Sequence, residues 1–123
     1  MYYKKEIGFE GETEACNYLE RLGYDIIKRN FSCKSGEIDI IAYDKSEDEI
    51  VFVEVKSRNQ IKYGEPAEAV DLLKSKHIRR TAEYYAYIND IESHKFRFDV
   101  IEIYSVSYNK FHIHHIIQAI DYD

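Results

Sequence analysis

The chain has 123 residues, of which 45% are hydrophobic and 33% charged, and its formal net charge is −6 at pH 7. This length and composition exclude a disordered chain and predict a single globular domain spanning residues 1–123. No apolar run is long enough to cross a membrane, and no apolar signal segment follows the N-terminus. The two cysteines lack the spacing of a metal site. We therefore expect a cytoplasmic protein without a membrane segment.

Seven segments show the periodicity of helices and strands. In chain order, we expect a helix, three strands, a second helix and two further strands over residues 6–22, 24–31, 36–43, 50–56, 67–90, 96–104 and 111–117. Serine, asparagine, glycine and proline mark the loop that precedes the second helix. This order, αβββαββ, predicts an α/β fold in which a mixed central sheet is flanked by helices.

The first predicted helix carries an acid on its apolar side. Ala15, Leu19 and Leu22 recur at three- and four-residue steps, Glu12 falls on the same stripe, and Gly23 ends the pattern. Near the start of a helix, Glu12 could simply interact favourably with the helix dipole. It could also point into a cleft and contact a metal ion through water, and the sequence leaves both interpretations open.

The second and third predicted strands each hold acidic residues within an apolar run. Strand interiors seldom contain Asp, Glu or Lys unless these residues are paired or bind a metal. Alternation places Asp39 on one face of its strand, together with Glu37 and Ile41, and places Glu54 and Lys56 on one face of the next strand. If the two strands are antiparallel and joined by a turn, the carboxylates of Asp39 and Glu54 approach each other.

Two carboxylates that face each other on a buried surface would repel unless a cation lies between them. Mg²⁺ suits this role, with Mn²⁺ as a substitute, because it binds one or two carboxylates, keeps several waters and accepts a substrate phosphate. The alternative is an edge strand whose charges reach solvent. However, Val51, Val53 and Val55 make the other face of the third strand apolar as well, which is typical of a central strand.

The second predicted helix is rich in basic residues. Lys74 falls on the stripe that should pack against the sheet, so it either contacts a substrate or extends its amine to solvent. Lys76, Arg79 and Arg80 lie on the outer face, where a solvated surface and phosphate contacts are both open interpretations.

The last predicted strand and the tyrosines give weaker signals. His112 and His114 share one strand face at a spacing that would allow metal binding, although a half-exposed strand commonly shows the same alternation. The 12 tyrosines would suit stacking on bases, packing of helices or an oligomer interface.

The order of Glu12, Asp39, Glu54 and Lys56 resembles the core of the PD-(D/E)xK nucleases. More closely, the chain resembles the YraN-type family of uncharacterised bacterial proteins, which are predicted endonucleases of the restriction-endonuclease-like superfamily, similar to Holliday junction resolvases. The matching stretches are Gly11-Glu12, Tyr18-Leu19, Arg29-Asn30-Phe31, Gly36-Glu37-Ile38-Asp39, Val51-Phe52-Val53-Glu54-Val55-Lys56 with Arg58, Ala69-Val70 with Lys74, and Arg97-Phe98-Asp99-Val100. The ordered set is far more specific than the acids and the lysine alone.

The resemblance implies a restriction-endonuclease-like fold and a set of site residues. Asp39 and Glu54 would bind Mg²⁺, the backbone carbonyl of Val55 would be a third ligand, and Lys56 would be the catalytic lysine. Glu12 would match the helical acid that resolvase-type nucleases place near the metal. The basic residues in the matching stretches that would contact the substrate are Arg29, Arg58 and Lys74. Asp99 also matches, although it could serve only to pair with a neighbouring arginine.

Two positions depart from the family pattern. Ser32 stands where a basic residue is expected, and Ser75 stands where a glutamine usually follows the lysine. Both departures would reduce contacts with a nucleic-acid backbone, and a net charge of −6 is also unusual for a protein that binds nucleic acid.

We therefore expect a Mg²⁺-dependent endonuclease that hydrolyses phosphodiester bonds in DNA, with branched or otherwise structured DNA among its candidate substrates. The alternative is a non-catalytic module of nuclease fold that binds nucleic acid or a protein partner, which the acidic charge and the two serines would favour. A hydrolase of sugars with a carboxylate pair is a third alternative, but the adjacent lysine and the lack of tryptophan argue against it. Resolvase-like nucleases work as dimers, so a homodimer is also an open expectation.

Overall fold

The computed structural model describes residues 3–58, 72–107 and 110–120. In chain order, its elements are α1 (Tyr3–Arg21), β1 (Asp25–Cys33), β2 (Gly36–Asp44), β3 (Glu49–Arg58), α2 (Leu72–Ile88), β4 (Lys95–Ser107) and β5 (Lys110–Ile116). The predicted order αβββαββ is confirmed. Neither described helix has both the length and the apolar composition of a membrane span.

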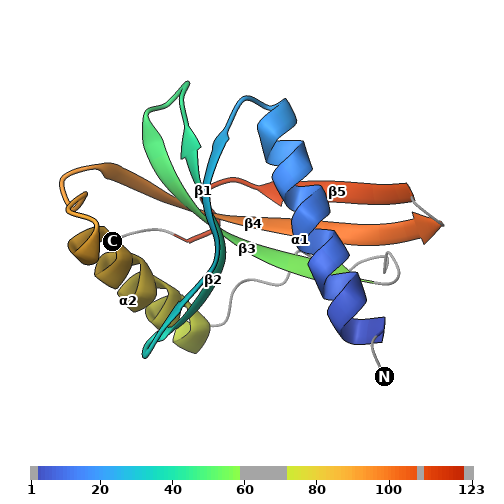
Figure 1. The fold of residues 1–123 in the computed structure, drawn as a ribbon, viewed down its shortest axis with the longest axis horizontal. Coiled ribbons are helices and arrows are strands. Elements are labelled where there is room, and N and C mark those ends of the chain that lie inside the picture. Colours follow the sequence, from blue (N-terminus) through green and yellow to red (C-terminus); the bar gives the residue numbers. More distant parts are fainter. Residues whose placement is uncertain (1–2, 59–71, 108–109, 121–123) are drawn as a thin grey trace.

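The strands form one sheet in the order β1-β2-β3-β4-β5. Strands β3 and β4 are parallel and are connected through α2, whereas the other neighbouring pairs are antiparallel. The prediction of a mixed α/β sheet with helices packed on it is therefore confirmed, and Figure 1 shows α1 crossing the sheet while α2 lies near its other end. Because β3 is the central strand, the alternative that it is a solvated edge strand is wrong.

Each face of the sheet has its own apolar core. On the α1 side, Ala15 and Leu19 pack against Ile40, and all three are fully buried. On the α2 side, Tyr85 contacts the edge of the Phe52 ring. Full burial of one large apolar side chain contributes about 1.5–3 kcal/mol, so both faces favour the folded state. This two-sided burial explains why β3 is apolar on both faces.

The helix C-terminus at Gly23 is formed as the sequence predicts. Gly23 has a φ of +94°, and the N–H of Tyr24 donates to the carbonyl of Leu19 at 3.0 Å, which is typical of a glycine C-cap. Leu22 was expected on the packed stripe but is 53% exposed, because the chain turns away from the sheet at this cap.

The second helix is described from Leu72 to Ile88, and positions 67–71 of the predicted helix lie outside the described residues. Ala82, Tyr85 and Ala86 form its buried stripe. Ile88, the last residue of α2, is exposed because it lies outside the helix surface that these three residues define.

Candidate metal centre

The candidate centre lies where the regular pairing of β2 and β3 stops. The register runs from Asp44 opposite Glu49 to Ile40 opposite Val53. Beyond that pair, the backbone N–H of Val55 donates to Oδ2 of Asp39 at 2.8 Å. A side-chain carboxylate therefore accepts a hydrogen bond that would otherwise go to the neighbouring strand.

The neighbouring strand β1 contains an irregularity at the same level. Asn30 has a φ of +54°, in the left-handed region, and the register of β1 and β2 leaves it opposite Asp39. Asparagine adopts this conformation more readily than other residues with a side chain. Local irregularities of this kind occur next to active sites, where they change the direction of a side chain.

The regular alternation of side chains between the two faces of the sheet is interrupted at Asn30 in β1 and beside Asp39 in β2. Arg29 bonds to a hydroxyl of α1, whereas Phe31, only two residues later, packs against a tyrosine of α2. On β2, Ile38 belongs to the α2-side core and Ile40 to the α1-side core. Asp39 lines the pocket on the α2 side, where Ile41 also lies as the alternation predicts, and the alternation breaks only between Asp39 and Ile38.

Asp39, Glu54 and Val55 all line one pocket with a volume of about 600 Å³. The pocket lies between the sheet and α2, which contributes His77. A Cβ atom on Gly36, at the start of β2, would lie only 3.3 Å from a threonine hydroxyl of α2, so glycine permits this close approach. Nothing in the sequence pointed to His77, because its position depends on how the helix packs.

The chemistry of the donor set fits a hard divalent cation. Asp39 and Glu54 offer carboxylate oxygens, and Val55 adds a backbone carbonyl nearby in the chain. Among the residues that the structure describes, no three His, Cys, Asp or Glu side chains cluster to hold a metal. A metal here would therefore combine two carboxylates with main-chain oxygen and water, as Mg²⁺ commonly does, and the set does not suit zinc.

The next basic residues of β3 lie beside the pocket. Lys56 is half-buried, follows Glu54 on the same strand face and does not line the pocket itself. The register places it opposite Glu102 of β4. Nε of Arg58 donates to Oε2 of Glu102 at 3.2 Å. Sequence reasoning missed Glu102, although it is an acid between two isoleucines, the same signal that Glu54 gives.

Glu12 and Arg29 lie together but apart from the pocket. Oε1 of Glu12 is 3.7 Å from Nη2 of Arg29, which also donates to the hydroxyl of Thr13 at 3.3 Å. Neither residue lines the pocket, so a role for Glu12 through metal-bound water stays a prediction. Lys74 lies within α2, but its side chain is outside the described part of the chain.

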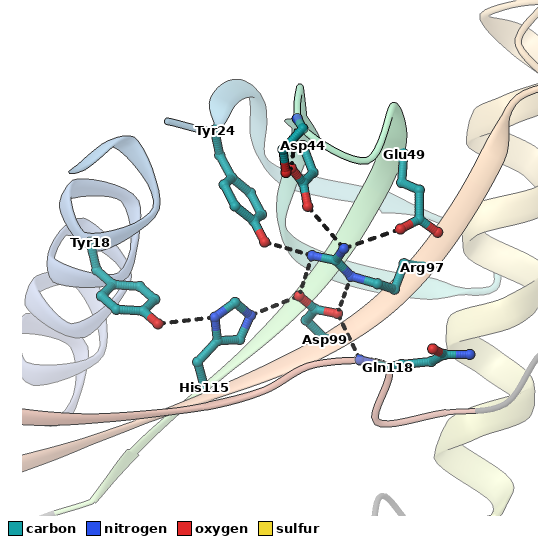
Figure 2. Close-up of polar contacts among 9 residues, drawn as sticks. Tyr18, Tyr24, Asp44, Glu49, Arg97, Asp99, His115 and Gln118 are labelled. Carbon is teal, nitrogen blue, oxygen red and sulfur yellow. Dashed lines mark hydrogen bonds and ion pairs between the residues drawn. The ribbon is translucent and has the colours of Figure 1, made fainter. Parts of the chain in front are cut away.

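A second group of charged residues occupies the α1 side of the sheet, and we call it the Arg97 network (Figure 2). Nε and Nη2 of Arg97 donate to the two carboxylate oxygens of Asp99 at 2.9 and 3.0 Å. Nη1 donates to Asp44 at 3.0 Å and to Glu49 at 3.2 Å, and Nη2 also donates to the hydroxyl of Tyr24 at 2.7 Å. These five bonds match the five N–H donors of a guanidinium group, so the arginine is satisfied by the protein.

Asp99 is equally well satisfied on its other side. Oδ2 is 2.7 Å from Nε2 of His115, and Oδ1 accepts the backbone N–H of Gln118 at 3.0 Å. Burial raises the pKa of Asp99, but the hydrogen bonds from His115, Arg97 and Gln118 outweigh it and hold the pKa below its ordinary value. Figure 2 shows His115 between Asp99 and Tyr18. The interpretation that Asp99 pairs with a neighbouring arginine is confirmed.

Comparison with known proteins places most of the chain within one family. Residues 11–103 match the uncharacterised protein family UPF0102. A UPF0102 protein of Clostridioides difficile is 49% identical over 115 residues, which cover 94% of this chain and 96% of the relative. A relative from Clostridium botulinum is 50% identical over 103 residues, covering 83% and 82% of the two chains. One from Caldicellulosiruptor saccharolyticus is 46% identical over 101 residues, covering 82% and 84%.

Proposed function

The chain belongs to the UPF0102 family, which confirms the YraN-type resemblance, and from this premise we propose that it is a Mg²⁺-dependent endonuclease of restriction-endonuclease-like fold. Its substrate is DNA, and branched or otherwise structured DNA is a candidate form. An enzyme of this kind would act in the cytoplasm. The names of the relatives carry no activity, so the proposal depends on the pocket.

One observation carries the proposal: Asp39 and Glu54, from neighbouring strands, line the same pocket at the point where strand pairing stops. The pocket is large enough for an ion, its waters and a phosphate group, and Val55, whose carbonyl would be the third ligand, also lines it.

The proposed roles follow from these positions. Asp39, Glu54 and the carbonyl of Val55 would hold Mg²⁺, and Mn²⁺ would replace it. When bound, the ion would polarise the scissile phosphate and lower the pKa of a water molecule. The N–H of Val55 orients the carboxylate of Asp39. The Lys56 amine, from the next residue on the same face as Glu54, would stabilise negative charge that develops on the phosphate oxygens.

The acidic net charge is compatible with this function, because a bound divalent cation adds positive charge where the phosphate must lie. Glu12 has a more distant role in this proposal. It pairs with Arg29 on the α1 side of the sheet, and a contact of Glu12 with the metal through water remains the prediction for it.

The test is metal-dependent cleavage by the parent protein and by a Glu54→Gln variant. We expect cleavage with Mg²⁺ or Mn²⁺ to fall at least about 10²–10³-fold in the variant, since one carboxylate ligand is lost. The matched control is Glu83→Gln, which removes an exposed carboxylate from α2. A folded Glu54→Gln protein that cleaves as fast as the parent would refute the proposal. Linear, single-stranded, flapped and four-way-junction DNA, together with RNA, should be compared as substrates.

The competing function is a nuclease-like module that binds nucleic acid or a protein without cutting it, and the serine at position 32 together with the acidic charge favours it. Calorimetric titration with Mg²⁺ separates the two functions. A nuclease should release or absorb heat on binding the metal, and Asp39→Asn should abolish that signal. A purely binding module should show no such heat.

A homodimer is part of the proposal. Tyr84, Tyr87 and Ile88 expose large apolar surface on the C-terminal half of α2, which would suit contact with a second copy. Light scattering at several protein concentrations tests this, and Tyr87→Glu should shift the equilibrium toward the monomer. A parent protein that is monomeric at all concentrations would exclude the dimer without affecting the nuclease proposal.

A further inference from the structure

Beyond the pocket, the central strands carry two rows of polar residues. The register of β3, β4 and β5 aligns Lys56, Glu102 and His114 in one row and Arg58, Tyr104 and His112 in the next. Directly opposed residues share a face, and alternate residues of one strand share a face. Both rows therefore lie on the same side as Phe52, which packs against α2, and so on the side of the pocket.

Glu102 contacts a basic residue in each of the two rows. Its side chain is only 3% exposed, Oε2 accepts the hydrogen bond from Nε of Arg58, and Oε1 is 3.0 Å from Nδ1 of His114. The two bases are much more exposed than the acid, at 32% for Arg58 and 53% for His114. A buried carboxylate thus fixes the orientation of two basic side chains that reach solvent.

The arginine of this cluster differs from the arginine of the Arg97 network. Arg97 uses five N–H donors within the protein, whereas in the described part of the chain Arg58 uses only Nε. His114 likewise uses only Nδ1 among the described residues. Among the described residues, the two Nη groups of Arg58 and Nε2 of His114 make no such bond, so these nitrogen atoms are the ones that would contact a ligand. A planar guanidinium with both Nη groups available matches the oxygens of a phosphate.

The distance along β3 fits a nucleic-acid strand. Arg58 lies four residues beyond Glu54, or roughly 13 Å at ~3.3 Å per residue. One DNA strand rises ~3.4 Å per nucleotide along the helix axis, so this span corresponds to about four nucleotides. Lys56 lies between the two positions. A strand whose scissile phosphate is in the pocket could therefore pass along these residues.

We propose that Lys56, Arg58 and His114 form a phosphate track for the DNA strand that leaves the pocket, and that Glu102 is the positioning residue that orients Arg58 and His114. This inference rests on the proposed nuclease function. The track explains how a chain with a net charge of −6 presents cations to DNA. Two adjacent histidines of β5 thus have different settings, because His115 is buried in the Arg97 network while His114 is exposed on the track.

The experiment measures kcat and KM for DNA cleavage, and DNA binding by fluorescence anisotropy in EDTA at several salt concentrations. We expect Arg58→Ala to raise KM about tenfold, with kcat within twofold of the parent. The slope of log Kobs against log[salt] should decrease in magnitude by about 0.9, because one phosphate contact is lost. Glu102→Gln should raise KM about threefold to tenfold, and Arg58→Lys should restore only part of the affinity.

Lys45→Ala is the matched control, because it removes an exposed cation from the β2–β3 turn, where Lys45 pairs with the exposed Asp25. It should change neither KM nor the salt slope. If the parent cuts DNA while Arg58→Ala and His114→Gln keep its KM and salt slope, the track is refuted and the nuclease function stands. If neither the parent nor Lys45→Ala cuts DNA, the nuclease function fails, and the salt slopes alone then decide whether these residues contact DNA. The exposed His114→Gln variant keeps the test decisive if Glu102→Gln does not fold.

Discussion

The two sides of the sheet accommodate charged residues of apolar strands in different ways. On the α1 side, Arg97 and Asp99 are buried and bonded within the protein, to each other and to residues of four other segments. On the α2 side, Asp39 and Glu54 line a pocket of about 600 Å³. The first arrangement is closed and holds the fold together, whereas the second faces a space that a ligand can enter.

The difference teaches that an acid in a buried strand is not by itself a sign of catalysis. Asp39 and Asp99 give the same signal in the sequence, a single aspartate within an apolar strand. Their partners separate them, because Asp99 is enclosed by a guanidinium, an imidazole and a backbone N–H. The two aspartates therefore allow the same substitution to be made on both sides of the sheet.

The largest expected effects come from that pair of substitutions. Asp39→Asn should reduce Mg²⁺-dependent cleavage at least about 10²–10³-fold, because a carboxylate ligand is lost, and should change the free energy of unfolding by less than about 1 kcal/mol. Asp99→Asn should leave the cleavage rate per folded molecule unchanged but lower the free energy of unfolding by about 3–5 kcal/mol. Urea unfolding and cleavage assays on both variants measure the contrast. A result in which both variants lose stability equally and keep activity equally would remove the distinction between the two sides.

The next largest effect is expected for Arg97 itself. Arg97→Met keeps the length of the side chain but leaves Asp99 and Asp44 buried without their cation, and removing one member of a buried pair costs about 3–5 kcal/mol. The midpoint of urea unfolding should fall accordingly. Arg80→Met is the matched control, since Arg80 is exposed on α2 and the loss of a surface charge should cost at most about 1 kcal/mol. Equal losses for the two arginines would mean that the Arg97 network adds little to the fold.

Much of this architecture could be predicted because it depends on local periodicity. The order of helices and strands follows from residue spacing, and the antiparallel pairing of β2 and β3 follows from the short turn between them. The proximity of Asp39 and Glu54 needed only that hairpin. The membership of Asp99 in an ion pair was also predictable, because Arg97 is two residues away on the same strand face.

The rest could not be predicted, because it depends on contacts between distant segments or on a single backbone angle. Tyr24 and Asp44 reach Arg97 only once strands β1 to β4 have assembled. The alternation of faces breaks between Ile38 and Asp39, opposite Asn30 in its left-handed conformation, and a strict strand period of two does not anticipate this. Glu102 gave a usable signal, but its partner His114 lies across a strand pairing that the sequence did not define.

A third and smaller effect on stability and Mg²⁺ binding is expected at Asn30. Substitutions here change the backbone beside Asp39 while they keep both acids of the pocket. Asn30→Gly should keep metal binding and stability close to those of the parent, because glycine adopts positive φ without strain. Asn30→Val should cost about 1–3 kcal/mol and weaken Mg²⁺ binding, because a β-branched residue disfavours this conformation and would shift Asp39. Calorimetric titration with Mg²⁺ and urea unfolding measure both effects. Equal metal affinity in the two variants would show that the orientation of Asp39 does not depend on Asn30.

The smallest expected effect is the loss of stability at low pH. It should arise from the Arg97 network on the α1 side of the sheet. Burial raises the pKa values of Asp99 and Asp44, but hydrogen bonds, from His115 and Arg97 at Asp99 and from Ser46 and Arg97 at Asp44, hold both below the ordinary value. A depressed folded-state pKa stabilises the fold above the unfolded-state pKa of about 3.9, and this stabilisation is lost as the pH falls through the folded-state value.

The free energy of unfolding should therefore be nearly constant from pH 7 to 5 with respect to these two groups and should fall below about pH 4. Urea unfolding at pH 7, 5, 4 and 3 measures this dependence. In Asp44→Asn, the decline below pH 4 should be shallower than in the parent, because one of the two depressed carboxyl groups is gone. A decline in Asp44→Asn as steep as that of the parent would mean that Asp44 contributes no acid-sensitive stability.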